Sequence, residues 1–238
     1  HNPEFTQLEF YMAYADYLKV MELTEQMIAF VCDKVTGKRQ VVFDGKEINF
    51  EIPWKRLELR QAILDNSGID INTHSNEKSL ADAMRKAGLN PKEGAPRGKL
   101  IDAIIGDLVE PSLIQPTFLF NYPRDISPLA KNIPGVPSMV ERFEGFAGGM
   151  ELCNAFTELN DPLEQEKRFL EMGREYSSDD EERHPMDEDY LNAMSYGMPP
   201  NGGFGMGVDR LTMLLTNKHS IREVLLFPHL RKEEESSS

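Results

Sequence analysis

The chain has 238 residues, 40% of them hydrophobic, and a net charge of −14 with a pI of about 4.8. This length is enough for one large domain or two small ones with a substantial core. The acidic balance argues against broad non-specific binding of nucleic acid, although it leaves a local contact with RNA open. No apolar run approaches the ~20 residues of a membrane span, so we expect no membrane partner.

The two cysteines, Cys32 and Cys153, lie far apart in the sequence and in apolar surroundings. No signal peptide is recognisable in the sequence given. This combination indicates reduced thiols in a hydrophobic core. We therefore expect a cytoplasmic protein.

The N-terminal part predicts a strand, a long helix and a hairpin. Polar and apolar residues alternate over 4–15, which indicates a strand. Apolar residues then recur at helical spacing from Tyr17 to about Val35, with Asp16 as the N-cap. Residues 38–50 predict a hairpin. The strand places Glu9 and Tyr11 on one face, where they could bind an ammonium group. The alternative is an exposed glutamate beside a half-buried tyrosine.

A helical insertion is expected at about 55–112. Its predicted helices cover 54–66, 79–87 and 99–108, and a short apolar strand follows over 116–122. None of these segments shows an obvious chemical motif.

The segment from 140 to 162 combines alternation with a central Gly148-Gly149 pair, which predicts a β-hairpin with a two-residue turn. This turn places Glu144 and Glu151 on one face, with Cα atoms ~7–8 Å apart. Two carboxylates at that spacing suit a hard divalent cation, and Mg²⁺ bridging to a phosphate is the usual case. The alternative is a solvated sheet face with ordinary surface glutamates.

A second set of alternating residues follows at Asn154, Phe156 and Glu158. Strict alternation would turn this set away from Glu151. For all four to line one pocket, a β-bulge must fall between Glu151 and Asn154, and bulges are common beside active sites.

The last third predicts a helix over 162–174, an acidic loop over 176–189, a short helix over 190–195, a strand over 220–227 that closes the sheet, and a polar tail over 231–238.

A glycine-rich segment spans 197–207 and leads into a helix that begins at about Asp209. Its glycines would let the backbone approach a ligand closely. Arg210, in the first helical turn, could contact a phosphate, and the alternative is a solvated arginine on a glycine-rich connection.

Taken together, five segments resemble the catalytic domain of class II lysyl-tRNA synthetases, over His1 to about Pro228. They are HNPEFTQLEFYMAYADY, SPLAK, ERFEGFAGGMELCNAFTELNDP, GMPPNGGFGMGVDRLTMLL and IREVLLFP. The resemblance implies an α+β fold, in which helices flank an antiparallel β-sheet. It also implies one partial catalytic domain over 1–230, with the helical insertion at about 55–112 and the tail at 231–238.

The resemblance further implies the roles of individual residues. The residues that would bind ATP are His1, Asn2, Phe5, Glu144, Glu151 and Arg210. The residues that would bind lysine are Glu9, Tyr11, Asn154, Phe156 and Glu158. Glu144 and Glu151 would hold the metal, Mg²⁺, on the ATP phosphates, and Arg210 would be the catalytic arginine.

The reaction implied is ATP-dependent activation of lysine to lysyl-adenylate, followed by transfer to tRNA(Lys), with a homodimer expected for the full-length family. The family's anticodon-binding domain, its motif 1 and the first half of its motif 2 do not occur in the sequence. We therefore expect part of an enzyme that is weak or inactive on its own. The alternatives are a binding module that keeps the pocket but loses turnover, and a ligase for another amino acid. Phe156 replaces a frequent tyrosine, and Gly145 a usually larger residue.

Overall fold

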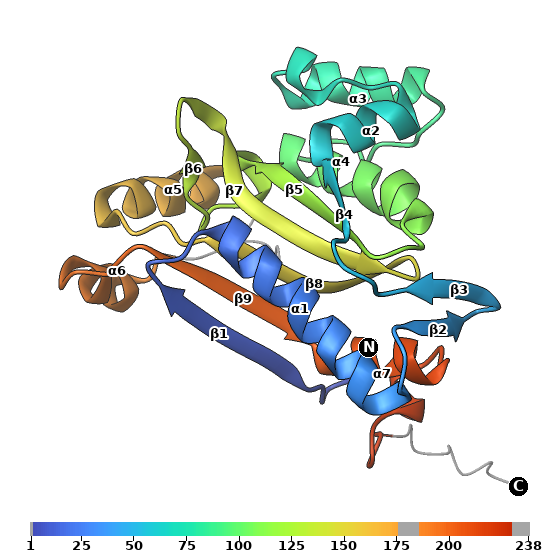
Figure 1. Ribbon diagram of the computed structural model, residues 1–238. Coiled ribbons are helices and arrows are strands. Elements are labelled where there is room, and N and C mark those ends of the chain that lie inside the picture. The colour runs from blue at the N-terminus through green and yellow to red at the C-terminus, as the bar shows by residue number, and fades with distance from the viewer. Residues whose placement is uncertain (1, 176–185, 230–238) are drawn as a thin grey trace, which may run out of the picture.

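A computed structural model of the chain describes residues 2–175 and 186–229. The described residues form an α+β fold around a mixed seven-stranded sheet with the order β1-β9-β8-β7-β5-β4, in which β6 pairs with β7 (Figure 1). All neighbouring pairs are antiparallel except β4 and β5. The strands are β1 (Gln7–Ala13), β4 (Lys55–Glu58), β5 (Thr117–Pro123), β6 (Asn132–Ile133), β7 (Val136–Ala147), β8 (Met150–Thr157) and β9 (Asn201–Gly207). The predicted fold class is thus confirmed, with one parallel pair at the edge of the sheet.

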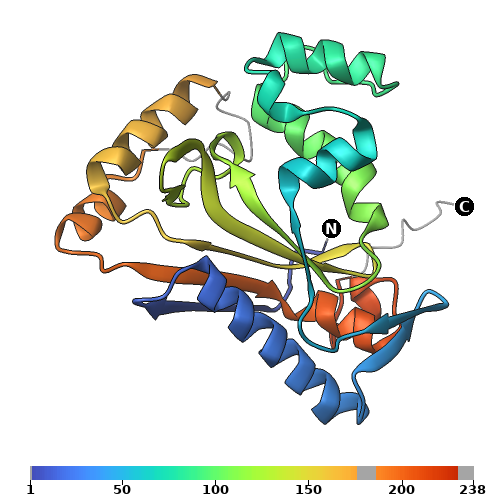
Figure 2. The same ribbon diagram turned by 45° about the horizontal axis from the view of Figure 1, so that its top comes forward.

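One face of the sheet packs against helix α1 (Tyr17–Thr36), which runs below it in Figure 2. The Asp16 carboxylate accepts the Lys19 N–H at 2.9 Å and caps the helix, and Gly37 ends it in the left-handed conformation. The predicted helix is therefore confirmed. Its buried residues pack against strand residues such as Phe143 and Phe204. Beyond it, β2 (Gln40–Phe43) and β3 (Lys46–Asn49) form the predicted hairpin.

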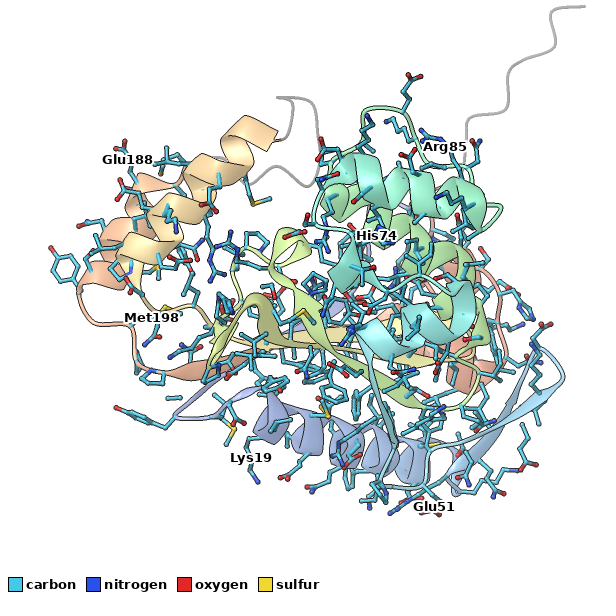
Figure 3. The ribbon with its side chains drawn as sticks, turned by 90° about the horizontal axis from the view of Figure 1, so that it is seen from above. Lys19, Glu51, His74, Arg85, Glu188 and Met198 are labelled. Carbon is cyan, nitrogen blue, oxygen red and sulfur yellow. The ribbon has the colours of Figure 1, made fainter. Side chains whose placement is uncertain are left out.

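The opposite face packs partly against the helical insertion, which stands above the sheet in Figure 2. The insertion contains α2 (Leu59–Ser67), α3 (Glu77–Lys86) and α4 (Arg97–Ile104), which continues as a π-helical stretch over Ile105–Val109. Figure 3 shows the insertion, marked by His74 and Arg85, and α6 (Glu188–Ser195), marked by Glu188, on opposite sides of the molecule. No helix in the described ranges is both long and apolar enough to cross a membrane.

The predicted helix over 54–66 is wrong at its start, because residues 55–58 form β4 and the helix begins at Leu59. Tertiary contacts hold this segment extended. The Trp54 ring stacks on Phe118 with centroids 4.9 Å apart, and the buried Glu25 carboxylate of α1 accepts the Trp54 N–H at 2.9 Å. Strand pairing with β5 then outweighs helix propensity.

The hairpin of β7 and β8 is confirmed. Gly148 and Gly149 have φ angles of 64° and 74°, which suits a two-residue turn that requires φ > 0 at both central positions. The strand register shifts after Gly145, which pairs with Cys153, while Phe146 pairs with Glu151. This leaves Leu152 as the extra residue and confirms the β-bulge predicted between Glu151 and Asn154.

The C-terminal part holds α5 (Pro162–Glu175), α6 and α7 (Val208–Thr216). The glycine-rich residues 201–207 form the inner strand β9, so the alternative interpretation of this segment as a connection does not hold. One prediction is wrong here, because residues 220–227 do not close the sheet.

Instead, Ile221–Glu223 is a 3₁₀ turn. Ser220 caps this turn in a reciprocal arrangement with Glu223, so the local hydrogen bonds compete with strand pairing. Most of the predicted acidic loop and the polar tail lie outside the described residues.

The pairing of Gly145 with Cys153 leaves no room for a side chain at position 145. A Cβ atom there would lie 2.6 Å from Cys153 Sγ and 3.2 Å from the Phe118 ring. We expect Gly145→Ala to lower the free energy of unfolding by about 1–3 kcal/mol, because the core must shift to admit the methyl group. Urea denaturation measures this change.

Gly173→Ala in α5 serves as the control, since a Cβ atom at position 173 would meet no neighbouring atom within 4 Å and alanine favours helix. In a Cys153→Ala background, Gly145→Ala should lower the free energy of unfolding by less, because the Sγ atom that the methyl group would meet is gone. An equal loss of free energy in both backgrounds would contradict this explanation.

Candidate active site

A cavity of about 700 Å³ lies over β1, β8 and β9 and reaches the start of α7. It brings together most of the predicted site residues, although they come from distant parts of the sequence. Those that line it are Asn2, Phe5, Glu9, Tyr11, Glu151, Asn154, Phe156, Glu158 and Arg210. Glu144 does not line it, and His1 lies outside the described residues.

The cavity stays open because the strand beneath it has no side chains at alternate positions. Gly203, Gly205 and Gly207 of β9 all line the cavity. A Cβ atom on Gly203 would lie 1.8 Å from Glu158 Oε1 and 3.0 Å from the Tyr11 ring. Glycine is therefore required at position 203 so that the glutamate and the tyrosine can lie against the backbone.

Glu158 forms one end of the cavity. It is only 5% exposed, and burial raises the pKa of its carboxyl group to about 8. Among the described residues, no side chain donates a hydrogen bond to this carboxyl group. Its backbone N–H donates to the Asn201 carbonyl at 2.9 Å, which fixes its position. Burial, and next the charge of Glu158, raise the pKa of Tyr11, so the phenol keeps its proton beside the glutamate.

The other end of the cavity carries Arg210 and Glu151. Arg210 Nη1 donates to the Glu151 carbonyl at 2.7 Å and to the Glu151 carboxylate at 3.2 Å. Burial raises the pKa of Glu151, and the nearby charge of Glu144 adds to this effect, while Arg210 opposes it. Asp209 accepts the Thr6 N–H at 2.5 Å, which ties the first turn of α7 to the segment before β1.

Glu144 lies beside this end but is covered by other side chains. The Tyr122 hydroxyl donates to Glu144 Oε2 at 2.7 Å, and Arg142 donates to Glu144 Oε1. Each carboxylate oxygen keeps a second lone pair for another ligand. In the part of the chain that the structure describes, no cluster of three His, Cys, Asp or Glu residues is arranged to hold a metal. A cation at Glu144 and Glu151 would thus take further ligands from water or phosphate, which fits Mg²⁺.

Two contributors to the site are absent from the sequence-based prediction. Arg142 binds both Glu144 and Asn154, and Tyr122 holds Glu144. Gly203 belongs to the predicted glycine-rich segment, and the structure adds that it makes room for Glu158. The alternation in β7 does contain a signal for Arg142, since residues 142 and 144 share a face. No comparable local signal marks Tyr122, whose place depends on the pairing of β5 with β7.

Comparisons with known proteins agree with this geometry. The family model described as tRNA synthetases class II (D, K and N) matches residues 1–231. The chain belongs to this family.

Among individual relatives, the chain is 50% identical over 232 residues to a protein named lysine–tRNA ligase from Chloroflexus aurantiacus. It is also 50% identical over 234 residues to one from Roseiflexus castenholzii, and 45% identical over 234 residues to one from Clostridium tetani. These matches cover 97–98% of the chain but 47–48% of the relatives, so the chain spans about half the length of the curated relatives it matches.

The buried carboxyl of Glu158 should make stability depend on pH. Its pKa is about 8 in the folded chain and near 4.5 when exposed, so between these values the folded chain holds a proton that the unfolded chain releases. The free energy of unfolding should therefore fall as pH rises from about 4.5 to about 8, and Glu158→Gln should remove this loss. Urea denaturation of both proteins at pH 5, 7 and 9 measures it.

We expect the free energy of unfolding of Glu158→Gln to exceed that of the wild type by most at pH 9 and by least at pH 5. A difference that does not change with pH would contradict the assigned pKa.

Proposed function

We propose that this chain is the catalytic part of a lysine–tRNA ligase, which activates lysine with ATP to lysyl-adenylate and passes the lysyl group to tRNA(Lys). One observation carries the proposal. Glu158 is a buried carboxyl group at the end of an open cavity, and the described residues supply no cation for it. An isolated charge is costly to bury, and an incoming ammonium group removes that cost.

The amino-acid end suits the side chain of lysine. Glu158 and the Tyr11 hydroxyl would bind the ε-ammonium group through charge-assisted hydrogen bonds, and Glu9 adds a second negative charge. Phe156 would cover the aliphatic part of lysine, and the Asn154 amide would contact its polar end. A neutral or acidic side chain would leave Glu158 without a partner, which disfavours a ligase for another amino acid.

The nucleotide end suits ATP. Phe5 is 62% exposed at the cavity and offers a ring on which adenine can stack. Among the described residues, Asn2 Oδ1 is buried without a hydrogen-bond partner and could accept from the adenine amino group. The contact of His1 with the nucleotide stays a prediction, because His1 lies outside the described residues. Arg210 would contact the phosphates.

Glu144 and Glu151 would hold Mg²⁺, which supplies positive charge to the phosphates when bound. The groups that the chain itself supplies would bind and orient the two substrates. With the lysine carboxylate beside the α-phosphorus, a carboxylate oxygen forms the new P–O bond, and the bond to pyrophosphate breaks with its electron pair on the leaving group. The tRNA terminal hydroxyl then attacks the lysyl carbonyl and AMP leaves. Positioning and charge stabilisation suffice, without a nucleophile from the protein.

The second candidate is a binding module that keeps the pocket but turns over slowly. The ion pair between Arg210 and Glu151 favours it, because the pair already engages Arg210 Nη1 and one oxygen of the Glu151 carboxylate without any substrate. The homodimer of the full-length family and the cytoplasmic location stay predictions.

Lysine-dependent ATP–pyrophosphate exchange tests the proposed function. We expect weak exchange by the chain, no exchange by Glu151→Ala, and a lysine KM raised about 10- to 100-fold by Glu158→Gln, because a charge-assisted hydrogen bond is lost. The control is Glu25→Gln, which changes another buried glutamate on the α1 side of the sheet and should leave the lysine KM unchanged.

Lysine binding without exchange would favour the binding module. No binding of lysine at all would contradict the proposed function.

Lysine binding should also release a proton. Below pH 8 the free chain holds a proton on Glu158, because burial raises its pKa to about 8, and pairing with an ammonium group requires the carboxylate. The affinity for lysine should therefore rise with pH up to about 8 and then level off. Calorimetry at pH 7 in buffers of different ionisation enthalpy measures the release, which should approach one proton per lysine.

The Glu158→Gln variant should release none. Equal release by both proteins would show that another group titrates.

A further inference from the structure

Arg142 lies at the border between the two ends of the candidate site. It sits in β7 two residues before Glu144, and it pairs across the strands with Phe156, while Glu144 pairs with Asn154. The side chain of Arg142 is only 15% exposed, and its guanidinium lies 4.6 Å from the centre of the Tyr122 ring. It does not line the main cavity, so any effect on substrates must act through its neighbours.

The guanidinium of Arg142 makes a fixed set of hydrogen bonds. Nε donates to Asn154 Oδ1 at 3.0 Å, and Nη2 donates to Glu144 Oε1. Nη1 donates to the Ile126 carbonyl at 2.6 Å and to Ser127 Oγ at 2.8 Å. Because the guanidinium is planar, these anchors fix the directions in which it meets Asn154 and Glu144.

The contact with Asn154 decides which way that amide points. Arginine can only donate hydrogen bonds, so Asn154 must present its oxygen to Arg142 and its NH₂ group elsewhere. Asn154 and Phe156 separate the main cavity from a second cavity of about 270 Å³, which Arg142 also lines. Without Arg142 the amide could turn its NH₂ group into this second cavity. With Arg142 in place, the NH₂ donors are available to a carboxylate in the main cavity.

The contact with Glu144 fixes the carboxylate that would hold the metal at the phosphate end of the site. Arg142 and the Tyr122 hydroxyl occupy one lone pair on each oxygen of Glu144. The carboxylate is therefore fixed in direction, with its remaining lone pairs available to a cation.

We propose that Arg142 is a positioning residue that sets the Asn154 amide and the Glu144 carboxylate together, and so links the amino-acid end of the site to the metal and phosphate end. This inference rests on the proposed function, because it assigns lysine to Asn154 and the metal to Glu144. It goes beyond that function, since Arg142 touches neither substrate and acts on both.

A double-mutant cycle between positions 142 and 154 tests this role, with the affinity for lysine measured by calorimetry. We expect Arg142→Gln to weaken lysine binding at least about 10-fold, because a charge-assisted hydrogen bond to the amide is lost. In an Asn154→Ala background the same substitution should change the affinity less than about 3-fold, since there is no amide left to orient. A role in general stability would give the same loss in both backgrounds, and that result would overturn the proposal.

The conservative variant Arg142→Lys separates the two contacts. An ammonium group keeps the positive charge near Glu144 but cannot donate to Asn154 and Glu144 in the fixed geometry of a guanidinium. We expect weaker lysine binding, with the affinity for ATP in the presence of Mg²⁺ kept within about 3-fold. A lysine affinity that Arg142→Lys leaves unchanged would overturn the proposal. This variant also serves if Arg142→Gln fails to fold, as judged by thermal unfolding.

The matched control is Arg60→Gln, which breaks an arginine–carboxylate pair with Asp70 in the insertion and should leave both affinities unchanged. Lysine binding by the wild-type chain distinguishes failure of the proposed function from failure of the role proposed for Arg142. If it binds no lysine, the proposed function fails, and this inference fails with it. If it binds lysine and the cycle is additive, only the role of Arg142 fails.

Discussion

The arrangement of the cavity depends on one buried carboxyl group that has no counter-charge in the described structure. Glu158 can occupy its place only because Gly203 has no side chain, and it holds that place because its backbone is paired with Asn201. Both glycine and asparagine belong to β9, an inner strand that could not serve as the cavity floor if it carried ordinary side chains. The strand gives up side-chain packing on one face, and glycine also weakens a strand, so the surrounding sheet must supply the stability.

Packing on the other face of the sheet supplies this stability. The packing of α1 against β7, β8 and β9 buries a continuous apolar cluster that includes Val20, Phe143 and Phe204. Gly202 belongs to this side, where a Cβ atom would lie 2.6 Å from Val20, so even this glycine serves close packing rather than the cavity. One strand therefore has two kinds of glycine, and the alternation of faces along the strand tells them apart.

The same physics explains what the sequence could predict. Local signals sufficed for α1, with its Asp16 cap, and for the hairpin with its two glycines. Even the bulge at Leu152 followed from asking that Glu151 and Asn154 share a pocket. Long-range pairing decided the rest: β4 is extended because of β5 and Glu25, and β9 is a strand because β1 and β8 flank it.

Within the site, the residues that carry charge toward the cavity were predictable, because an alternating glutamate or an arginine after a glycine-rich segment is visible in the sequence. The residues that position these charged side chains were not predictable from the sequence. Tyr122 reaches Glu144 from another strand, and nothing near residue 122 in the sequence indicates that partner. Arg142 was visible as a neighbour of Glu144, but its second contact with Asn154 exists only because the bulge returns that residue to the same face.

The two ends of the site make opposite electrostatic demands, and this has a consequence for how it is assembled. Glu158 and Glu9 attract a cation, whereas a polyphosphate at the other end would meet Glu144 and Glu151 in a chain of net charge −14. Arg210 and Arg142 offset part of that charge, but each is already paired with one of the two glutamates. Additional positive charge would therefore favour the approach of a polyanion, so the electrostatics of the proposed ATP site support the proposed divalent cation as well as the fit to its carboxylates.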